Sequence, residues 1–307
     1  MIIRTRTRCD ETLLKGSKVS FIATATIGYD HLDIEYLKRA HITWTNCPGC
    51  NANSVGQYIH SCLLLLEKEK GYNLSKTTVG LVGVGHVGHA VIEAIRPLGV
   101  QILLNDPPQK EALRKAGKPH EFFLKMEELQ EKCDIISFHT PLITKGPYPT
   151  FHLANKTFFN ALKKQPIIIN TSRGAVVDNT DVLQALKDGI IRDAIIDTWE
   201  NEPNINQELL NLIYIGTPHI AGYSADGKAN ATRMALTALC NHFHLPVTFQ
   251  IRVPQLPEEE LPEPNLTETE RALVLYNPHT DSLKLKSHPT MFEELRGNYP
   301  LRREFIE

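Results

Sequence analysis

The central part of the chain alternates short apolar runs with amphipathic stretches. Each run is rich in β-branched residues and apolar at successive positions, so both of its faces avoid water. This pattern is typical of parallel strands covered by helices on both sides. It predicts six strands, at residues 78–83, 100–105, 134–139, 166–171, 193–197 and 213–217.

Helical spacing fills the intervals between these runs. Apolar residues recur at every third or fourth position over 87–98, and Gly99 ends the stretch. Residues 179–189 begin with a capping Asn and end with Gly. Six strands with intervening helices predict a doubly wound α/β domain with a six-stranded parallel sheet, which is the Rossmann arrangement.

A smaller α/β unit is predicted before this domain. Residues 1–7, 19–24 and 41–45 favour strands, and a long helix over 53–70 connects the two units. A further helix over 225–244 follows the sixth strand. We therefore expect the larger domain at 56–223 and the smaller one at 1–55 together with 224–250.

The composition changes after residue 250. Residues 254–264 are rich in proline and acid, which indicates a linker. Residues 272–276 and 283–286 flank Asn-Pro-His-Thr-Asp-Ser, a pattern that favours a hairpin, and a short helix is expected over 292–298. The segment 251–307 therefore predicts a linker and a small α+β domain. Because it is too small to bury a core alone, it should pack on another domain or on a second subunit.

Composition and charge exclude several classes of protein. The chain has 307 residues and a net charge of −2, with 33 basic and 35 acidic residues. It offers no basic field for a nucleic acid or an anionic membrane, so neither is expected as a partner. The N-terminus has no apolar signal core, and the longest strongly apolar run, 62–66, is far shorter than a membrane span of about 20 residues. A cytoplasmic protein is expected.

The six cysteines are sparse and are expected to be reduced. Cys47 and Cys50 have the spacing of a redox pair, but Pro48-Gly49 between them indicates a turn, so a structural loop is the favoured interpretation. No Cys/His cluster has the spacing of a structural zinc site, and no metal is expected.

A dinucleotide-binding motif follows the first strand of the larger domain. Gly83-Val84-Gly85-His86-Val87-Gly88 is a G-x-G-x-x-G that directly precedes a helix. The first glycine permits the tight turn, the second lets the backbone approach a pyrophosphate, and the third lets helix and strand pack closely. The next strand ends in Asp106, where a carboxylate accepts hydrogen bonds from ribose hydroxyls. Because it repels a 2′-phosphate, NAD is favoured over NADP.

Three further residues follow later strands of the same sheet. Arg173, Glu202 and His219 come after the fourth, fifth and sixth strands, where an open α/β sheet presents its cleft. Each alone has an ordinary explanation, as an ion-pair residue, a surface acid before a proline, or one of 13 histidines. Together they form a set suited to oxidation of a 2-hydroxy acid. A guanidinium holds the carboxylate, an imidazole takes the hydroxyl proton, and a carboxylate orients the imidazole.

These motifs resemble the D-isomer-specific 2-hydroxyacid dehydrogenase family. The match rests on 83–88, 170–174, Glu202-Pro203 and His219. Segments 24–31, 47–51, 138–142, 146–148 and 219–223 are similar to members of that family that oxidise a phosphorylated four-carbon 2-hydroxy acid. The resemblance implies a flavodoxin-like fold for the smaller substrate-binding domain, a C-terminal dimerisation domain and a homodimer. It also implies a first strand and helix that precede the family's equivalent of Met1, so the first βα unit is expected to be absent here.

The resemblance also assigns residues. It implies catalytic roles for Arg173 and Glu202, with His219 as the acid/base. It implies substrate contacts at Thr5, Thr26 and Tyr223. The cofactor-contacting positions that it and the glycine motif give are Gly83, Gly85, His86, Val87, Gly88, Asp106, Thr140, Thr171, Ser172, Arg173, Asp197 and Gly222.

A phosphorylated substrate requires local cations. Arg4, Arg6 and Arg8 alternate along the predicted first strand and would share one face, so Arg4 or Arg6 is a candidate for the phosphate. The alternative is a solvated basic edge that discourages strand pairing. Two other functions also stay open. One is a dehydrogenase of another acid, such as glycerate, lactate or 3-phosphoglycerate, and the other is an NAD-sensing corepressor-like protein on the same fold.

Overall fold

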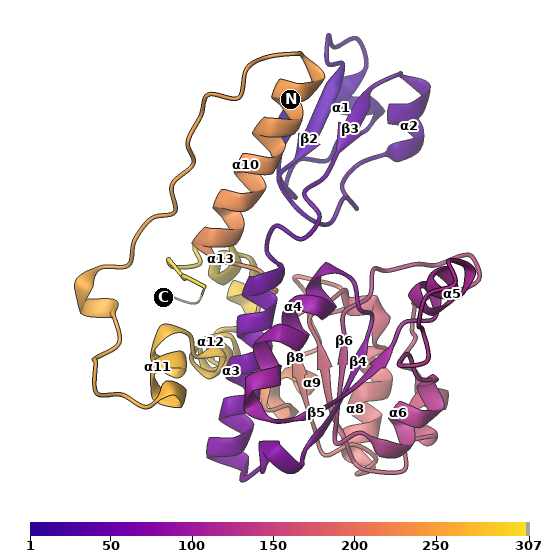
Figure 1. The fold of residues 1–307 in the computed structure, drawn as a ribbon, viewed down its shortest axis with the longest axis vertical. Helices are drawn as coiled ribbons and strands as arrows, with labels where there is room; N and C mark the ends of the chain where they lie inside the picture. Colours follow the sequence, from indigo (N-terminus) through magenta and orange to yellow (C-terminus); the bar gives the residue numbers. More distant parts are fainter. Residues whose placement is uncertain (305–307) are drawn as a thin grey trace.

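The larger of two parallel sheets dominates the computed structural model, which describes residues 1–304 (Figure 1). Its strand order is β5-β4-β6-β7-β8-β9, with every pair parallel. The predicted six-stranded Rossmann sheet is confirmed. The strands are β4 (Thr78–Val82), β5 (Gln101–Asn105), β6 (Ile135–Phe138), β7 (Ile167–Asn170), β8 (Asp193–Ile196) and β9 (Ile215–Gly216).

Both faces of this sheet are covered, as the continuous apolar runs predict. Along β7, Ile167 and Ile169 belong to one hydrophobic cluster and Ile168 to the other. The helices α3 (Ala52–Lys70) and α4 (His86–Ile95) cover the first face. The second face packs against α6 (Met126–Lys132), α7 (Lys156–Asn160), α8 (Asn179–Lys187) and α9 (Gln207–Leu212), while α5 (Pro107–Lys115) follows β5.

The smaller sheet lies apart from the larger one, at the far end of the molecule (Figure 1). Its order is β1-β2-β3, all parallel. The long helix α10 (Ala225–His242) packs on β2, where the Phe21 and His242 rings stack at 4.5 Å. The other elements are β1 (Ile2–Ile3), β2 (Phe21–Thr24), β3 (Thr43–Thr45), α1 (Glu11–Leu14) and α2 (Ile34–Arg39).

The first strand is shorter than predicted. It ends at Ile3, and the chain then turns, with the Thr7 amide donating a hydrogen bond to the Arg4 carbonyl at 3.1 Å. The prediction that Arg4, Arg6 and Arg8 share one face of a strand is therefore wrong. A turn in place of extended backbone removes the alternation on which that prediction depended.

The predicted C-terminal hairpin is also wrong. The segment forms α11 (Glu268–Leu275) and α12 (Pro278–Ser287), followed by α13 (Phe292–Gly297), which matches the predicted last helix. Asn277 and Pro278 start a helix here and do not form a turn. The Asn277 side chain accepts a hydrogen bond from the His279 amide at 3.0 Å, and Pro278 occupies the first helical position. The described tail is helical, not α+β.

This helical tail packs on the larger sheet, one of the two placements expected. The edge strand β9 is covered by α12, whose Ser282 hydroxyl accepts a hydrogen bond from the Gly216 amide at 2.9 Å. Leu285 and Phe292 are fully buried in the cluster under the sheet. Residues 305–307, the end of the predicted C-terminal domain, lie outside the described residues.

The remaining regular structure consists of short 3₁₀ turns. One of them, η4, lies within the predicted linker, which otherwise has no regular secondary structure (Figure 1). The turns are η1 (Leu74–Lys76), η2 (Arg96–Leu98), η3 (Gly174–Val176), η4 (Glu258–Glu260) and η5 (Pro289–Met291). Within residues 1–304 no helix is long and apolar enough to cross a membrane.

Candidate active site

The glycine motif forms a tight turn between β4 and α4. Gly83 has φ +91°, and a Cβ there would lie 2.7 Å from the His139 carbonyl oxygen. A Cβ on Gly88 would lie 2.4 Å from the Gly83 oxygen, so only glycine permits this approach of helix and strand. Beside Gly85, by contrast, no heavy atom lies within 4 Å of a Cβ position. The N-terminus of α4, which includes His86 and Val87, is thus open to an anion.

Asp106 joins the end of β5 to this loop. Its Oδ2 accepts a hydrogen bond from the Val84 amide at 2.8 Å, and its Oδ1 accepts one from the Gln109 amide at 2.9 Å and so caps α5. The carboxylate is half-buried. It therefore shapes the loop, a role that the sequence interpretation did not foresee, while its contact with a ribose stays a prediction.

Polar side chains gather where β6 and β7 end. Thr140 Oγ1 is buried and has no hydrogen-bond partner among residues 1–304, so it is available to a ligand. Thr171 Oγ1 lies 3.3 Å from His139 Nδ1, and the Ser172 hydroxyl donates to Asn170 Oδ1 at 2.9 Å. Burial lowers the pKa of His139 to about 3, so this ring is neutral.

His219 and Glu202 form a close pair. His219 Nδ1 lies 2.8 Å from Glu202 Oε2 and 3.1 Å from Oε1. The histidine side chain is 27% exposed and the glutamate 18%, so the pair is sheltered but reachable. Burial opposes ionisation of Glu202, but the hydrogen bond and charge of His219, the Trp199 amide and the charge of Arg296 together hold its pKa below the ordinary value.

Asp197 holds the backbone that carries His219. It is 1% exposed, and its Oδ1 accepts hydrogen bonds from Thr217 Oγ1 at 2.6 Å and the Ile220 amide at 2.7 Å. Its Oδ2 accepts one from the Ala221 amide at 2.9 Å. Burial raises the pKa of Asp197. His219 adopts φ +56°, a strained conformation for a residue with a side chain, and these bonds on both sides help to hold it.

Arg173 reaches toward the smaller sheet. Its Nη1 donates to the Ser172 carbonyl at 2.8 Å, and its Nε donates to Asp30 Oδ2 at 3.3 Å. A Cβ on Gly28 would lie 2.2 Å from Arg173 Nη2, so glycine leaves the room that the guanidinium occupies. Sequence reasoning missed Asp30, although it lies in the family-like segment 24–31.

The predicted substrate residues come from separate elements. Thr26 Oγ1 donates to the Gly28 carbonyl at 2.8 Å, while Thr5 is exposed in the turn after β1. The Tyr223 ring has Lys228 Nζ 5.4 Å from its centre. Asn51 Nδ2 donates to the Gly222 carbonyl at 3.0 Å, and a Cβ on Gly222 would collide with that amide.

The N-terminal arginines separate into different environments. Arg6 lies 3.8 Å from Glu293 on α13, and Arg8 pairs with Asp10 at 3.0 Å. Arg4 instead lies near Lys228, whose pKa is lowered by burial and by the charge of Arg4. Lys228, which the sequence interpretation did not single out, therefore joins Arg4 as a candidate anion contact.

The environment of the cysteines supports the interpretation of Cys47 and Cys50 as part of a structural loop. All six are free and buried in the structure. Burial raises the pKa of Cys50 to about 12, which disfavours the reactive thiolate. The Cys47 thiol donates to the Ala231 carbonyl at 3.3 Å. In residues 1–304 no group of three or more His, Cys, Asp or Glu side chains is placed to hold a metal ion.

Comparison with known proteins places this geometry in a family. Residues 63–221 match the NAD-binding domain of the D-isomer specific 2-hydroxyacid dehydrogenases. An erythronate-4-phosphate dehydrogenase of Bacteroides fragilis is 54% identical over 304 residues, which cover 99% of this chain and 85% of the relative. The enzyme of the same name from Escherichia coli O157:H7 is 39% identical over 314 residues, covering 99% and 82%.

A solved structure shows the same architecture. The NAD⁺-bound 3-phosphoglycerate dehydrogenase of Entamoeba histolytica superposes with a TM-score of 0.66 at 27% identity, covering 83% of this chain and 82% of that one. The family and the fold predicted from the sequence motifs are therefore confirmed.

Proposed function

Because the chain belongs to the D-isomer-specific 2-hydroxyacid dehydrogenases and, within them, to the erythronate-4-phosphate dehydrogenases, we propose that it oxidises 4-phospho-D-erythronate at C2 with NAD. The product is 3-hydroxy-2-oxo-4-phosphonooxybutanoate, in the route to vitamin B6. The observation that carries the proposal is the sheltered His219–Glu202 pair, which follows the last two strands of an NAD-binding sheet.

The pair provides the proton transfer. Because Nδ1 of His219 is bonded to Glu202, its Nε2 is left for the substrate and takes the proton of the C2 hydroxyl. Glu202 stays ionised, since its pKa is held low, and it stabilises the imidazolium that forms. Glu202 also fixes the ring, so that no reorientation is needed as the proton moves.

Arg173 holds the reacting end of the acid. Its guanidinium can bind the substrate carboxylate with two parallel hydrogen bonds and polarise the oxygen at C2. Arg173 Nε donates a hydrogen bond to Asp30 Oδ2 in the structure. The substrate carboxylate would take the place of this exposed aspartate.

The residues present fit NAD, which supplies the hydride acceptor when bound. The open backbone at Gly85 and the start of α4 suit a pyrophosphate, and Asp106 stands at the end of β5 where a ribose would lie. The Thr140 hydroxyl, which is buried and has no hydrogen-bond partner in residues 1–304, supplies a polar contact beside the glycine loop. Thr171, Ser172, Asp197 and Gly222 complete the proposed cofactor-binding positions at the strand ends.

The phosphate end is assigned to Arg4 and Lys228. Lys228 Nζ lies 5.4 Å from the centre of the Tyr223 ring, and the charge of Arg4 lowers the pKa of Lys228, so the two cations repel each other. Among residues 1–304 neither cation forms an ion pair. A dianionic phosphate would relieve their mutual repulsion. Arg6 is the weaker candidate because it already lies against Glu293. Thr5 and Thr26 are the proposed hydroxyl contacts.

We propose that the chain has the domain boundaries given above. We also propose that it assembles as a homodimer. Val274 on α11 and Leu283 on α12 are each 54% exposed, so they offer apolar surface to a second copy. We also propose a cytoplasmic location, where NAD and phosphorylated acids are retained. Sedimentation at micromolar concentration tests the dimer, and a species with the mass of one chain would contradict it.

A substrate panel tests the function. Formation of NADH is followed with 4-phospho-D-erythronate, 3-phosphoglycerate, glycerate and lactate. We expect fastest turnover with the first acid and a loss of roughly 10²–10⁴-fold in kcat for His219→Ala. His244→Ala replaces an exposed histidine two residues after α10; it is the matched control and should retain activity. NAD binding without turnover of any of the four acids would indicate a sensor, not an enzyme.

A further inference from the structure

The last described helix, α13, brings a cation to the proposed active site. Arg296 Nη1 lies 3.8 Å from Glu202 Oε2, the same oxygen that is 2.8 Å from His219 Nδ1. The guanidinium carbon of Arg296 also lies 5.9 Å from the centre of the Tyr223 ring. One side chain from the C-terminal helices thus adjoins both the proposed proton-transfer pair and a proposed substrate contact.

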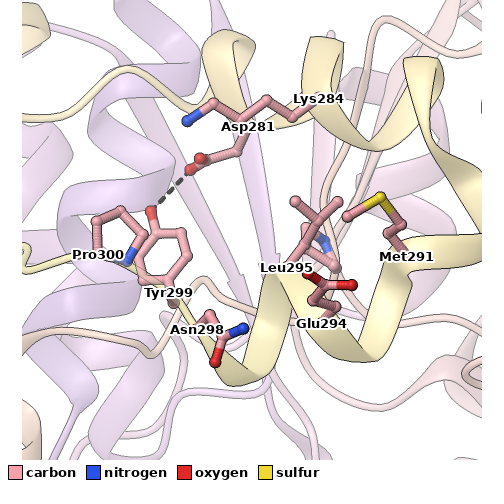
Figure 2. Close-up of a pocket in the computed structure, with 9 residues that line it drawn as sticks. Asp281, Lys284, Met291, Glu294, Leu295, Asn298, Tyr299 and Pro300 are labelled. Atoms are coloured by element: carbon pink, nitrogen blue, oxygen red, sulfur yellow. Dashed lines mark hydrogen bonds between the residues drawn. The ribbon is translucent and has the colours of Figure 1, made fainter.

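The placement of Arg296 is fixed by the packing of α13. Its side chain is 17% exposed, and its Nε is buried without a hydrogen-bond partner in the described part of the chain. Phe292 anchors the start of the helix and is fully buried. Beyond its end, Tyr299 points toward α12 and donates a hydrogen bond to Asp281 at 2.7 Å (Figure 2).

A row of alternating charges continues from Arg296 to the smaller sheet. Glu293 Oε1 lies 3.5 Å from Arg296 Nη1, and Glu293 Oε2 lies 3.8 Å from Arg6 Nη2. Arg6 is 74% exposed and Glu293 48%, so this outer pair contributes little energy. The sheltered contact between Arg296 and Glu202 is the one that matters for the site.

We propose that Arg296 is a positioning residue of the active site, which orients the Glu202 carboxylate toward His219 and holds Tyr223 where the substrate would bind. The inference rests on the proposed dehydrogenase function. It gives the C-terminal helices a part in catalysis in addition to the dimerisation expected of them.

Arg296 can act on Glu202 because it brings a positive charge close to the carboxylate. The groups that face Glu202 are His219 from the loop after β9 and Arg296 from α13, with Asp197, Glu293 and Tyr223 around them. Arg296 favours ionised Glu202 against the opposing effect of burial. Without it, Glu202 takes up a proton at higher pH, and a protonated Glu202 stabilises the imidazolium of His219 less well.

Kinetics of three variants test this role. In Arg296→Met we expect kcat to fall at least tenfold and the acid-side loss of activity to move up by about one pH unit, with an unchanged KM for NAD. Arg296→Lys keeps the charge and should restore most of the acid-side profile. Arg271→Met removes a cation from α11, away from the site, and should match the unaltered protein.

A substrate-free measurement separates this inference from the function. The side-chain carboxyl carbon of Glu202, assigned with Glu202→Gln, is titrated by NMR. We expect its pKa to rise by about one unit in Arg296→Met and to stay in place in Arg271→Met. If no acid is turned over by the unaltered protein, the proposed function fails while this titration still tests the contact.

Two results would overturn the inference. One is an unchanged Glu202 titration together with an unchanged kcat in Arg296→Met. The other result is used if the methionine variant does not fold, and it compares Arg296→Lys, which keeps the charge, with Arg296→Gln, which removes it. If these two variants have the same acid-side profile and the same Glu202 titration, the inference is wrong.

Discussion

At the scale of single residues, the contact between Arg173 and Asp30 involves the side chain that the proposed mechanism assigns to the substrate. The guanidinium that the mechanism assigns to the substrate carboxylate donates to Asp30 Oδ2 at 3.3 Å, and Asp30 is 73% exposed. Asp30 lies in the segment after β2 of the smaller sheet, and Arg173 lies just after the end of β7. The pair therefore also joins the two sheets. In the proposed mechanism the substrate carboxylate competes with this aspartate for Arg173.

Replacing Asp30 should ease that competition. In Asp30→Asn we expect the KM for the acid to fall by about two- to fivefold with kcat unchanged, because an exposed ion pair contributes no more than about 1 kcal/mol. Steady-state kinetics at low and high salt check this. Because salt screens the ion pair, the difference in KM between the variant and the unaltered protein should be smaller at high salt. A higher KM in the variant would show instead that Asp30 helps to place Arg173.

Which residues could be predicted depends on how they reach the site. Arg173, Glu202 and His219 could be proposed because each directly follows a recognisable strand, and parallel strands bring their carboxyl ends to one edge. Arg296 and Lys228 lie on helices outside that sheet. No spacing rule connects them to it, so only the packing reveals them.

At the scale of elements, the strands of the larger sheet were predictable and the tail was not. Buried parallel strands leave a strong pattern, because both of their faces are apolar. The segment from 272 to 286 combines β-branched and turn-forming residues, which favours a hairpin when taken alone. Two caps decide otherwise: Asn277 begins α12, and the Thr267 hydroxyl accepts from the Glu270 amide at 3.2 Å at the start of α11.

The cap on α12 gives a stability prediction. In Asn277→Ala the His279 amide loses its acceptor, and we expect the free energy of unfolding to fall by about 1 kcal/mol. Chemical denaturation measures the difference, with Asn298→Ala, which follows α13 and caps no helix N-terminus, as the control. An unaltered midpoint in Asn277→Ala would mean that the cap does not stabilise the helix.

At the scale of the whole molecule, the end of the described chain returns to the start of α10 (Figure 1). Asp226 Oδ2 accepts from Arg303 Nε at 2.9 Å, and its Oδ1 accepts from Nη2 at 3.1 Å. Next to this pair, buried Arg302 donates to the Ala221 carbonyl at 2.8 Å, two residues after His219. The tail therefore braces the backbone of the proposed active site.

The ion pair between Asp226 and Arg303 makes the stability of the fold depend on pH. Burial alone would raise the pKa of Asp226. The hydrogen bonds and charge of Arg303 and the hydrogen bond from the Glu304 amide outweigh burial and hold this pKa below its ordinary value. A depressed carboxyl pKa stabilises the fold above the unfolded value of about 4, and this contribution is lost as pH falls through the folded value.

Asp226→Asn should therefore cost about 2 kcal/mol of unfolding free energy at neutral pH. Denaturation at several pH values checks it. The gap between the variant and the unaltered protein should hold from pH 7 to about 5 and narrow only below about 4. A gap that closes already between pH 7 and 5 would contradict the assignment to this carboxylate.

The transfer of hydrogen from C2 tests the central claim most directly. The protein is given NAD and 4-phospho-D-erythronate with deuterium at C2, and the NADH is analysed by mass spectrometry. The account predicts one deuterium in each NADH formed, with formation suppressed in His219→Ala. NADH without deuterium, or no NADH at all from this acid, would contradict it.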